Sequence, residues 1–138
     1  MMTFAGLEIT ASAMRAQRER LKVIASNLAN ASTTRGPDGL GPYRRRDVVF
    51  APAPLEEAPS APLGVKVVGV IEDPRPPQVI YDPAHPDADE KGFVKLPNIN
   101  VLEEMTNLMM AFRAYEAAVA AFNTTKAIYM RILEPGGM

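Results

Sequence analysis

The longest uninterrupted stretch of this sequence runs from Asn100 to Glu134 and contains neither glycine nor proline. Its apolar side chains recur at alternating intervals of three and four residues, the spacing of a coiled-coil stripe, and Lys126 is the one polar interruption. Asn100, followed three positions later by Glu103, predicts a capped helix start. At about 1.5 Å per residue the helix is roughly 50 Å long. A helix of this length with an apolar stripe requires a partner along that stripe.

The beginning of the chain repeats the pattern. Thr3 is a candidate cap, apolar residues follow in the same rhythm as far as Leu28, and Gly36 and Pro37 end any helix. The simplest arrangement pairs the two helices antiparallel, as a coiled coil. The residues expected to form its core, and with it the subunit interface, are Phe4, Leu7, Met14, Leu21, Leu28, Met105, Leu108, Phe112, Tyr115, Val119, Phe122, Tyr129 and Leu133.

Further apolar residues, among them Ile24 and Met110, lie off these stripes. Surplus apolar surface on a small chain indicates contact with other chains. The alternative is a plain intramolecular helical hairpin in which the stripes are satisfied by each other.

Between Arg35 and Pro97 the composition changes, because all but one of the 13 prolines lie there and proline excludes long helices. The runs expected to form strands are Tyr43–Ala51, Val65–Glu72, Val79–Tyr81 and Phe93–Leu96. The second run is apolar on both faces, which predicts a central strand. The proline-rich tract Pro52–Pro62 predicts an exposed, extended loop.

Together these patterns predict an α+β fold in three parts. Residues 1–34 hold the N-terminal helix, residues 35–99 a small proline-rich β module, and residues 100–138 the C-terminal helix. Because the β module is inserted between the two helices, both chain ends are expected at the helical end of the molecule.

Composition excludes several classes of protein. The formal net charge of −1 gives no overall field for nucleic acid or an acidic membrane. The absence of cysteine excludes disulfides, thiolate catalysis and cysteine-based zinc sites. No apolar run reaches about 18 residues, so no membrane span is expected. The N-terminal residues lack the basic and apolar blocks of a secretory signal peptide, so none is expected.

The single histidine, His85, stands among Asp82, Asp87, Asp89 and Glu90, a set of residue types that binds divalent cations. Alternating prolines and aspartates favour a turn instead. No second histidine and no nucleophile motif accompany His85. We therefore expect no catalytic residue, metal, cofactor or small-molecule substrate, and a metal-dependent enzyme centred on His85 is the competing hypothesis.

The basic triplet Arg44–Arg46 follows a Gly–Pro turn. Arginines contact phosphate, but neither an aromatic platform nor a basic face supports nucleic-acid binding here. On a strand the three side chains alternate between faces. The triplet therefore predicts a solvated strand edge or a salt bridge between subunits, and no binding of nucleic acid.

Two runs of sequence are similar to the bacterial flagellar basal-body rod proteins. One begins at Ser26 with SNLANASTTRGPDGLGPYRRRDVVF, and its Asn-Leu-Ala-Asn segment is shared by rod, hook and filament-cap proteins. The other runs from Val79 to Lys126 and contains the pattern YDPxHPDADxxGxVxxPNxN, which is typical of proximal rod members. With the two terminal heptad patterns, the resemblance covers nearly the whole chain.

This resemblance implies a structural protein, not an enzyme, that is exported without signal cleavage by the flagellar type III apparatus. It implies assembly in the periplasm with itself, with other rod proteins and with the rotor and export-gate base, forming a helical tube that transmits motor torque and encloses the export channel. The terminal helices are expected to line the tube, with the β module outside. A soluble coiled-coil adaptor with a β head is the alternative.

Overall fold

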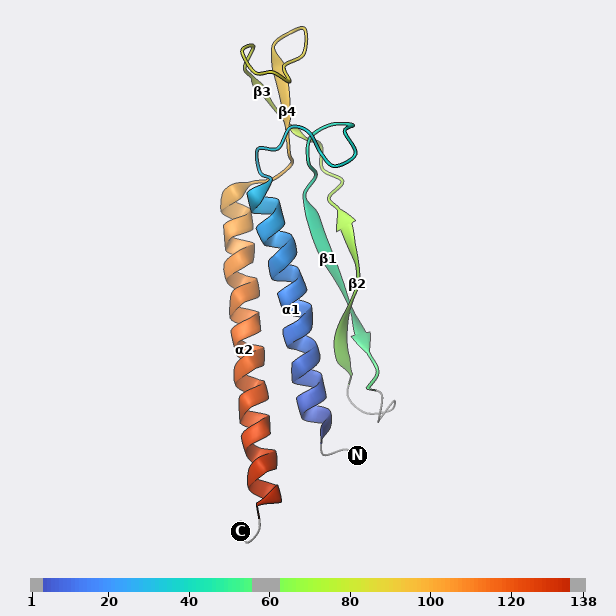
Figure 1. Ribbon diagram of the computed structural model, residues 1–138, viewed down its shortest axis with the longest axis vertical. Helices are drawn as coiled ribbons and strands as arrows, with labels where there is room; N and C mark the ends of the chain where they lie inside the picture. The colour runs from blue at the N-terminus through green and yellow to red at the C-terminus, as the bar shows by residue number, and fades with distance from the viewer. Residues whose placement is uncertain (1–3, 56–62, 135–138) are drawn as a thin grey trace.

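The computed structural model describes residues 4–55 and 63–134, which form two long helices and two β-hairpins (Figure 1). In chain order the elements are α1 (Ala5–Ala29), β1 (Arg46–Ala53), β2 (Gly64–Glu72), β3 (Gln78–Tyr81), β4 (Phe93–Leu96) and α2 (Val101–Leu133). The predicted α+β class is confirmed, and each strand lies within a few residues of its predicted position.

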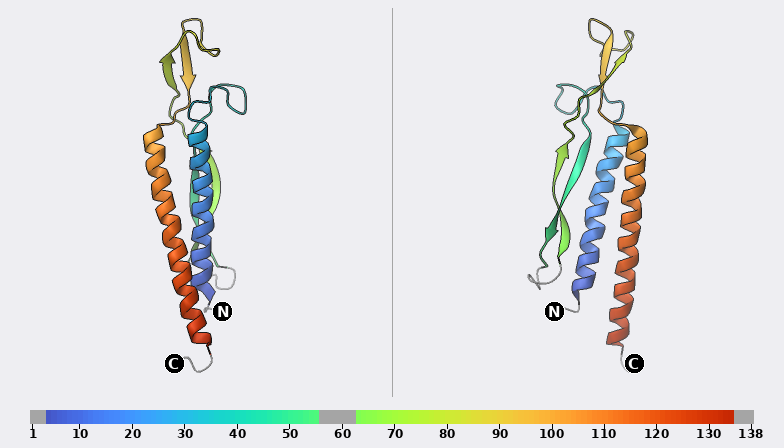
Figure 2. Two further views of the ribbon diagram at one scale, coloured as in Figure 1. Left: turned by 60° about the vertical axis from the view of Figure 1, so that its left-hand side comes forward. Right: turned by 180° about the vertical axis from the view of Figure 1, so that it is seen from behind.

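The helices α1 and α2 lie side by side and run in opposite directions (Figures 1 and 2). The rings of Phe4 and Tyr129 meet edge to face, with 5.9 Å between their centroids, where α1 begins and α2 ends. At the opposite end of the pair, the Asn27 side chain donates a hydrogen bond to the Glu104 carboxylate. The predicted antiparallel pairing of the two terminal helices is therefore present.

Local chemistry sets the ends of the helices. The Asn100 side chain accepts a hydrogen bond of 3.1 Å from the backbone N–H of Glu103, which confirms the predicted cap of α2. The helix α1 ends at Ala29, where the backbone N–H of Asn30 donates to the Ser26 carbonyl at 3.0 Å. The predicted cap at Thr3 lies outside the described residues.

The strands β1 and β2 form an antiparallel hairpin that lies along α1 (Figure 2). A close approach holds them together at Gly64, where an added Cβ would lie 2.7 Å from the Ser12 Oγ. The same Oγ accepts a hydrogen bond of 3.1 Å from the Val65 N–H. Glycine at position 64 therefore lets the strand reach the surface of the helix.

The prediction that the second strand is central is wrong, because β2 pairs with β1 alone in the described part of the chain. Its side chains alternate: Val65 and Val67 are partly buried, whereas Val68 and Val70 are exposed. The reason is that only one face of the hairpin is covered by a helix. The predicted loop also begins later than expected, since Pro52 belongs to β1, and residues 56–62 of that tract lie outside the described residues.

The strands β3 and β4 form a second hairpin, at the end of the molecule far from the free ends of the helices (Figure 1). The loop between them closes with a hydrogen bond of 2.9 Å from the Asp82 N–H to the Gly92 carbonyl. Gly92 has a φ of 86°, and a Cβ there would lie 2.9 Å from the Tyr81 ring. Both facts require glycine at this position.

The buried apolar residues form no single thick core. They are spread along the contacts of α1 and around the base of the second hairpin, and they are Ala16, Ile24, Tyr43, Leu55, Val94, Ile99, Ala111 and Ala118. Within residues 4–55 and 63–134, neither helix combines the length and hydropathy that a membrane crossing requires.

Candidate functional site

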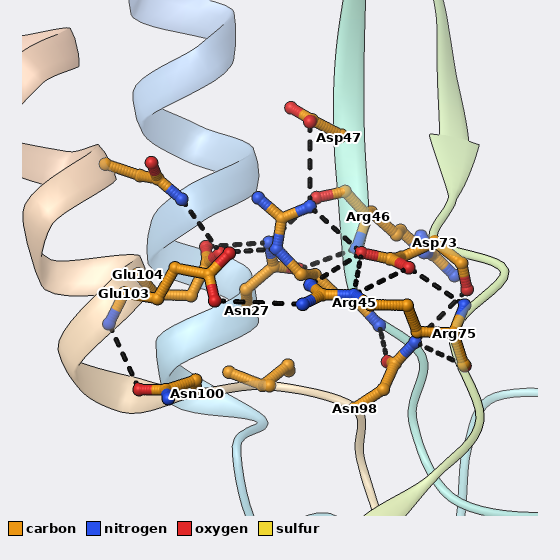
Figure 3. Close-up of polar contacts among 12 residues, drawn as sticks. Asn27, Arg45, Arg46, Asp47, Asp73, Arg75, Asn98, Asn100, Glu103 and Glu104 are labelled. Atoms are coloured by element: carbon orange, nitrogen blue, oxygen red, sulfur yellow. Dashed lines mark hydrogen bonds and ion pairs between the residues drawn. The ribbon is translucent and has the colours of Figure 1, made fainter.

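Most of the buried polar residues gather where α1 ends, β1 begins, β2 ends and α2 begins (Figure 3). We call this cluster the polar junction and define it by Asn27, Arg45, Asp73, Asn98 and Glu104. Its members come from segments far apart in the sequence. The junction therefore fixes both hairpins relative to the paired helices.

The carboxylate of Glu104 is at the centre of the junction and is fully buried, with a relative exposure of 0%. Arg45 Nε donates to Glu104 Oε1, and Asn27 Nδ2 donates to Oε2 at 3.1 Å. Asn107, one turn along α2, donates a further hydrogen bond of 3.2 Å to Oε1. A carboxylate removed from water is tolerated only with such partners, and here both oxygens are engaged.

Arg45 joins this carboxylate to two others. Its Nη1 lies 3.4 Å from Asp73 Oδ2 and 3.6 Å from Asp47 Oδ2. Burial alone would lower the pKa of Arg45, but the hydrogen bond and the charge of Glu104 hold that pKa above its ordinary value. The guanidinium therefore stays charged and bridges the start of α2 to the end of β2.

Two asparagines connect these side chains to the backbone. Asn27 pairs with Arg46 as a neighbouring strand would: its Nδ2 donates to the Arg46 carbonyl at 2.8 Å, and its Oδ1 accepts from the Arg46 N–H at 3.0 Å. Asn98 accepts from the Arg45 N–H at 2.8 Å and donates to the carbonyls of Asp73 and Arg75 at 3.1 and 2.9 Å. These bonds satisfy backbone groups where the strands leave their sheets.

Asp73 lies at the outer edge of the junction. Arg75 Nη2 donates to its Oδ2 at 2.8 Å, and Arg75 also lies 3.7 Å from Glu103 on α2. The side-chain hydrogen bond from Arg75 is the largest influence on the pKa of Asp73 and outweighs burial, which would raise it. With the Arg75 backbone hydrogen bond and the charges of Arg75 and Arg45, it lowers that pKa to about 2. The carboxylate is therefore ionised at any ordinary pH.

The prediction for the basic triplet is wrong for its middle member. Arg45 is buried and pairs within its own chain, whereas Arg44 is exposed and Arg46 lies with its guanidinium carbon 5.6 Å from the Tyr43 ring centroid. The alternation of faces was expected, but the buried acceptor was not, because Glu104 looks like any acidic residue in the first turn of a helix. The sequence carries one sign of this burial: Glu104, Ala111 and Ala118 recur at intervals of seven and so lie on one face of the helix.

That row is the face of α2 most covered by α1: the relative exposures of Ala111 and Ala118 are 0% and 9%. Small side chains therefore fill the contact between the helices. On α1 the corresponding contact residues include Gly6, which has Thr125 and Tyr129 within 3.2 Å of the position of an added Cβ. The large apolar residues of the predicted core lie beside this contact instead of inside it.

In both helices, the predicted core residues are displaced from the helix contact by the same step along the sequence. Met105, Phe112 and Val119 each follow a contact residue of α2 by one position, and Leu7 and Leu28 follow Gly6 and Asn27 on α1 in the same way. One position turns a side chain by about 100° around a helix. Because the helices are antiparallel, equal turns bring both stripes to one side of the pair. We call this surface the apolar side: Leu7, Met14, Leu21, Leu28, Met105, Phe112 and Val119.

None of the predicted interface residues is fully buried within the single chain. Those on the apolar side or flanking the helix contact are partly buried: Leu7, Met14, Leu21, Leu28, Leu108, Tyr115, Val119, Phe122 and Tyr129. The remainder, Phe4, Met105, Phe112 and Leu133, are exposed, and half of the Phe112 side-chain surface is accessible (52%). The hairpin β1–β2 leaves the apolar side open, because it meets α1 through another flank that includes Ser12.

His85 forms a turn, as expected. Its N–H donates to the Asp82 carbonyl at 3.1 Å, and its Nδ1 accepts from the Asp87 N–H at 3.0 Å. The carboxylate of Asp87 is engaged by Thr34 and Arg35, at 2.6 and 2.9 Å. In the part of the chain that the structure describes, no three histidine, cysteine or acidic residues are placed to hold a metal ion.

Comparison with known proteins shows the family of the chain. The family described as "Flagella basal body rod protein" matches residues 7–37, and "Flagellar basal body rod FlgEFG protein C-terminal" matches residues 90–134. The flagellar basal-body rod protein FlgC of Escherichia coli O157:H7 is 48% identical over 94% of each chain. The FlgC proteins of Borreliella burgdorferi and Bacillus subtilis are 41% and 40% identical, over 94% and 99% of this chain and 95% and 99% of their own. The chain belongs to the family of flagellar basal-body rod proteins FlgC.

Proposed function

We propose that the apolar side of the paired helices is the surface through which this chain packs against neighbouring subunits of the flagellar rod. Family membership gives the chain a structural, non-enzymatic role in the flagellar basal body, as predicted. The observation that carries the surface assignment is the shared displacement of both apolar stripes to one open side of the pair. The coiled-coil adaptor is not supported, because the relatives are rod proteins.

The three predicted parts of the chain then have different roles in the rod. The helical parts, residues 1–34 and 100–138, supply packing along the rod, and residues 35–99 supply the outer contacts. Neighbours of this surface are second copies of the chain, other rod proteins and the base of the basal body. Contacts that join different surfaces of successive subunits build a helical tube when their rotation does not close into a ring. Dense helix packing in its wall resists twisting and so transmits torque around a central export channel.

The test is to replace Met105 and Phe112 together with glutamine in cells that lack the native protein. Both side chains are exposed in the single chain, so the free subunit should keep its fold and should still be exported. Basal bodies isolated from these cells should lack rods, because every subunit loses the same contact. Leu40→Gln is the matched control, since it removes an apolar side chain that is 88% exposed and lies off the helices. Normal rods from the double variant would contradict the proposal.

A further inference from the structure

All four methionines of α2 are open to solvent in the single chain. Met105, Met109, Met110 and Met130 have relative exposures of 49%, 65%, 58% and 63%. Methionine more often fills gaps inside a core. The chain contains no cysteine, so thioethers are its only sulfur groups, and oxidation of methionine to its sulfoxide is common. The surface of α2 is therefore sensitive to oxidants in a way that an aliphatic surface would not be.

Three of these methionines share the side of α2 that carries Phe112. At about 100° per residue, Met105, Met109 and Met130 fall within about 60° of one another around the helix axis, and Phe112 lies within the same arc. Met105 belongs to the apolar side, and the other two extend that side outward and toward the end of the helix. We call these three residues the methionine row. Met110 is turned by about 140° from Met105 and so lies on a different face.

We propose that the methionine row is a site of reversible oxidation and that oxidation there excludes the subunit from the rod. The oxidant is hydrogen peroxide, which transfers one oxygen atom to the sulfur. The peroxide O–O bond breaks, an S–O bond forms, the sulfur is oxidised by two electrons, and the second peroxide oxygen leaves as water. Methionine sulfoxide reductases return the sulfoxide to the thioether.

The sulfoxide acts differently in the free and the assembled subunit. In the free subunit water can bond to its oxygen, because the methionine row is exposed, so the fold should be unchanged. Against a neighbouring subunit the same oxygen would lose water on an apolar surface, which is unfavourable without a hydrogen-bond donor. The inference rests on the proposed function and adds a chemical condition to it: only subunits with reduced thioethers pack through the apolar side.

Competition within one cell tests this proposal. The native chain and a triple variant, Met105→Leu with Met109→Leu and Met130→Leu, carry different tags and are expressed together in cells whose own copy is deleted. Leucine is apolar and of similar volume but has no sulfur to oxidise. Without peroxide, both chains should enter basal bodies in the ratio of their unassembled pools. With hydrogen peroxide present during rod assembly, at a concentration that leaves the cells viable, the triple variant should be enriched severalfold.

Met110→Leu is the matched control, because Met110 is as exposed as the methionine row but lies on another face. In competition with the native chain, its ratio in basal bodies should not change with peroxide. Peptide mass spectrometry of the unassembled pool should find sulfoxide at the methionine row. Denaturant unfolding of the purified subunit should be the same before and after oxidation, which separates loss of assembly from loss of fold.

Three outcomes would overturn the inference. They are sulfoxide at the methionine row without enrichment of the triple variant, equal enrichment of Met110→Leu, and absence of sulfoxide from the row under peroxide. Each leaves the proposed function standing if the variant with Met105→Gln and Phe112→Gln still forms no rods. Normal rods from that double variant would remove the proposed function and this inference with it.

Discussion

Two regions of α2 differ in how completely one chain satisfies them. At the polar junction, the buried carboxylate of Glu104 and the guanidinium of Arg45 find their partners within the same chain. On another face of the same helix, Met105, next to Glu104, and Phe112, about two turns further along, are about half exposed (49% and 52%). The first region is satisfied within one chain, whereas the second leaves large apolar side chains open, and we propose that another chain covers them.

This difference separates the residues that stabilise the single chain from those that we propose for assembly. Small residues such as Ala111 and Ala118 let the helices approach closely, and the junction fixes their ends. Folding of the single chain therefore leaves much of the surface of its large apolar side chains unburied. We propose that this remaining apolar surface packs against neighbouring subunits. Changes at the junction should therefore act on the stability of the free subunit, and changes on the apolar side should act on assembly.

The largest effect is expected for Glu104→Ala. This variant leaves the buried Arg45 without its main partner, and breaking a buried pair in this way costs about 3–5 kcal/mol. Denaturant unfolding of the purified subunit measures the loss. Glu103→Ala is the matched control: it lies one position away with a side chain that is 49% exposed, so its effect should be small.

A second substitution sharpens the test. Replacing Arg45 with leucine in the Glu104→Ala background removes the unpaired charge, so part of the lost stability should return. Equal free energies of unfolding for Glu104→Ala and Glu103→Ala would show that the junction does not hold the fold together.

The sequence predicted the features that depend on local chemistry. Asn100 is predictable as a cap because the cap needs only its own side chain and the next turn, and short apolar runs between prolines predict the strands. Arg45 was misplaced because its burial depends on Glu104, 59 residues away. The offset of the stripes was missed for a related reason. A heptad pattern shows which side of a helix is apolar, but not whether that side faces the same chain or a neighbour.

A smaller loss of stability is expected when the pH is lowered. The folded pKa of Asp73, about 2, lies below its ordinary value of 3.8. The folded state therefore binds this proton less readily than the unfolded state, and the stabilisation is present above about pH 4 and is lost as the pH falls toward about 2. Unfolding measured across this range should depend less on pH for Asp73→Asn than for the native chain. Glu72→Gln, at the exposed neighbouring position, should keep the native dependence; identical profiles for all three chains would contradict the role of Asp73.

The smallest effect on the free subunit should come from Phe112→Ala, although the substitution removes a whole aromatic ring. Exposed substitutions usually change the free energy of unfolding by no more than ~0.5 kcal/mol. Phe122, three turns along α2, is partly buried, so Phe122→Ala should destabilise the free subunit more than Phe112→Ala does. In assembled rods the open ring of Phe112 becomes part of the contact, and Phe112→Ala should then block incorporation into basal bodies. Unfolding of the purified variants, measured together with their recovery in basal bodies, separates the two roles. A large loss of free-subunit stability from Phe112→Ala would place that ring in the fold of the single chain and remove it from the assembly surface.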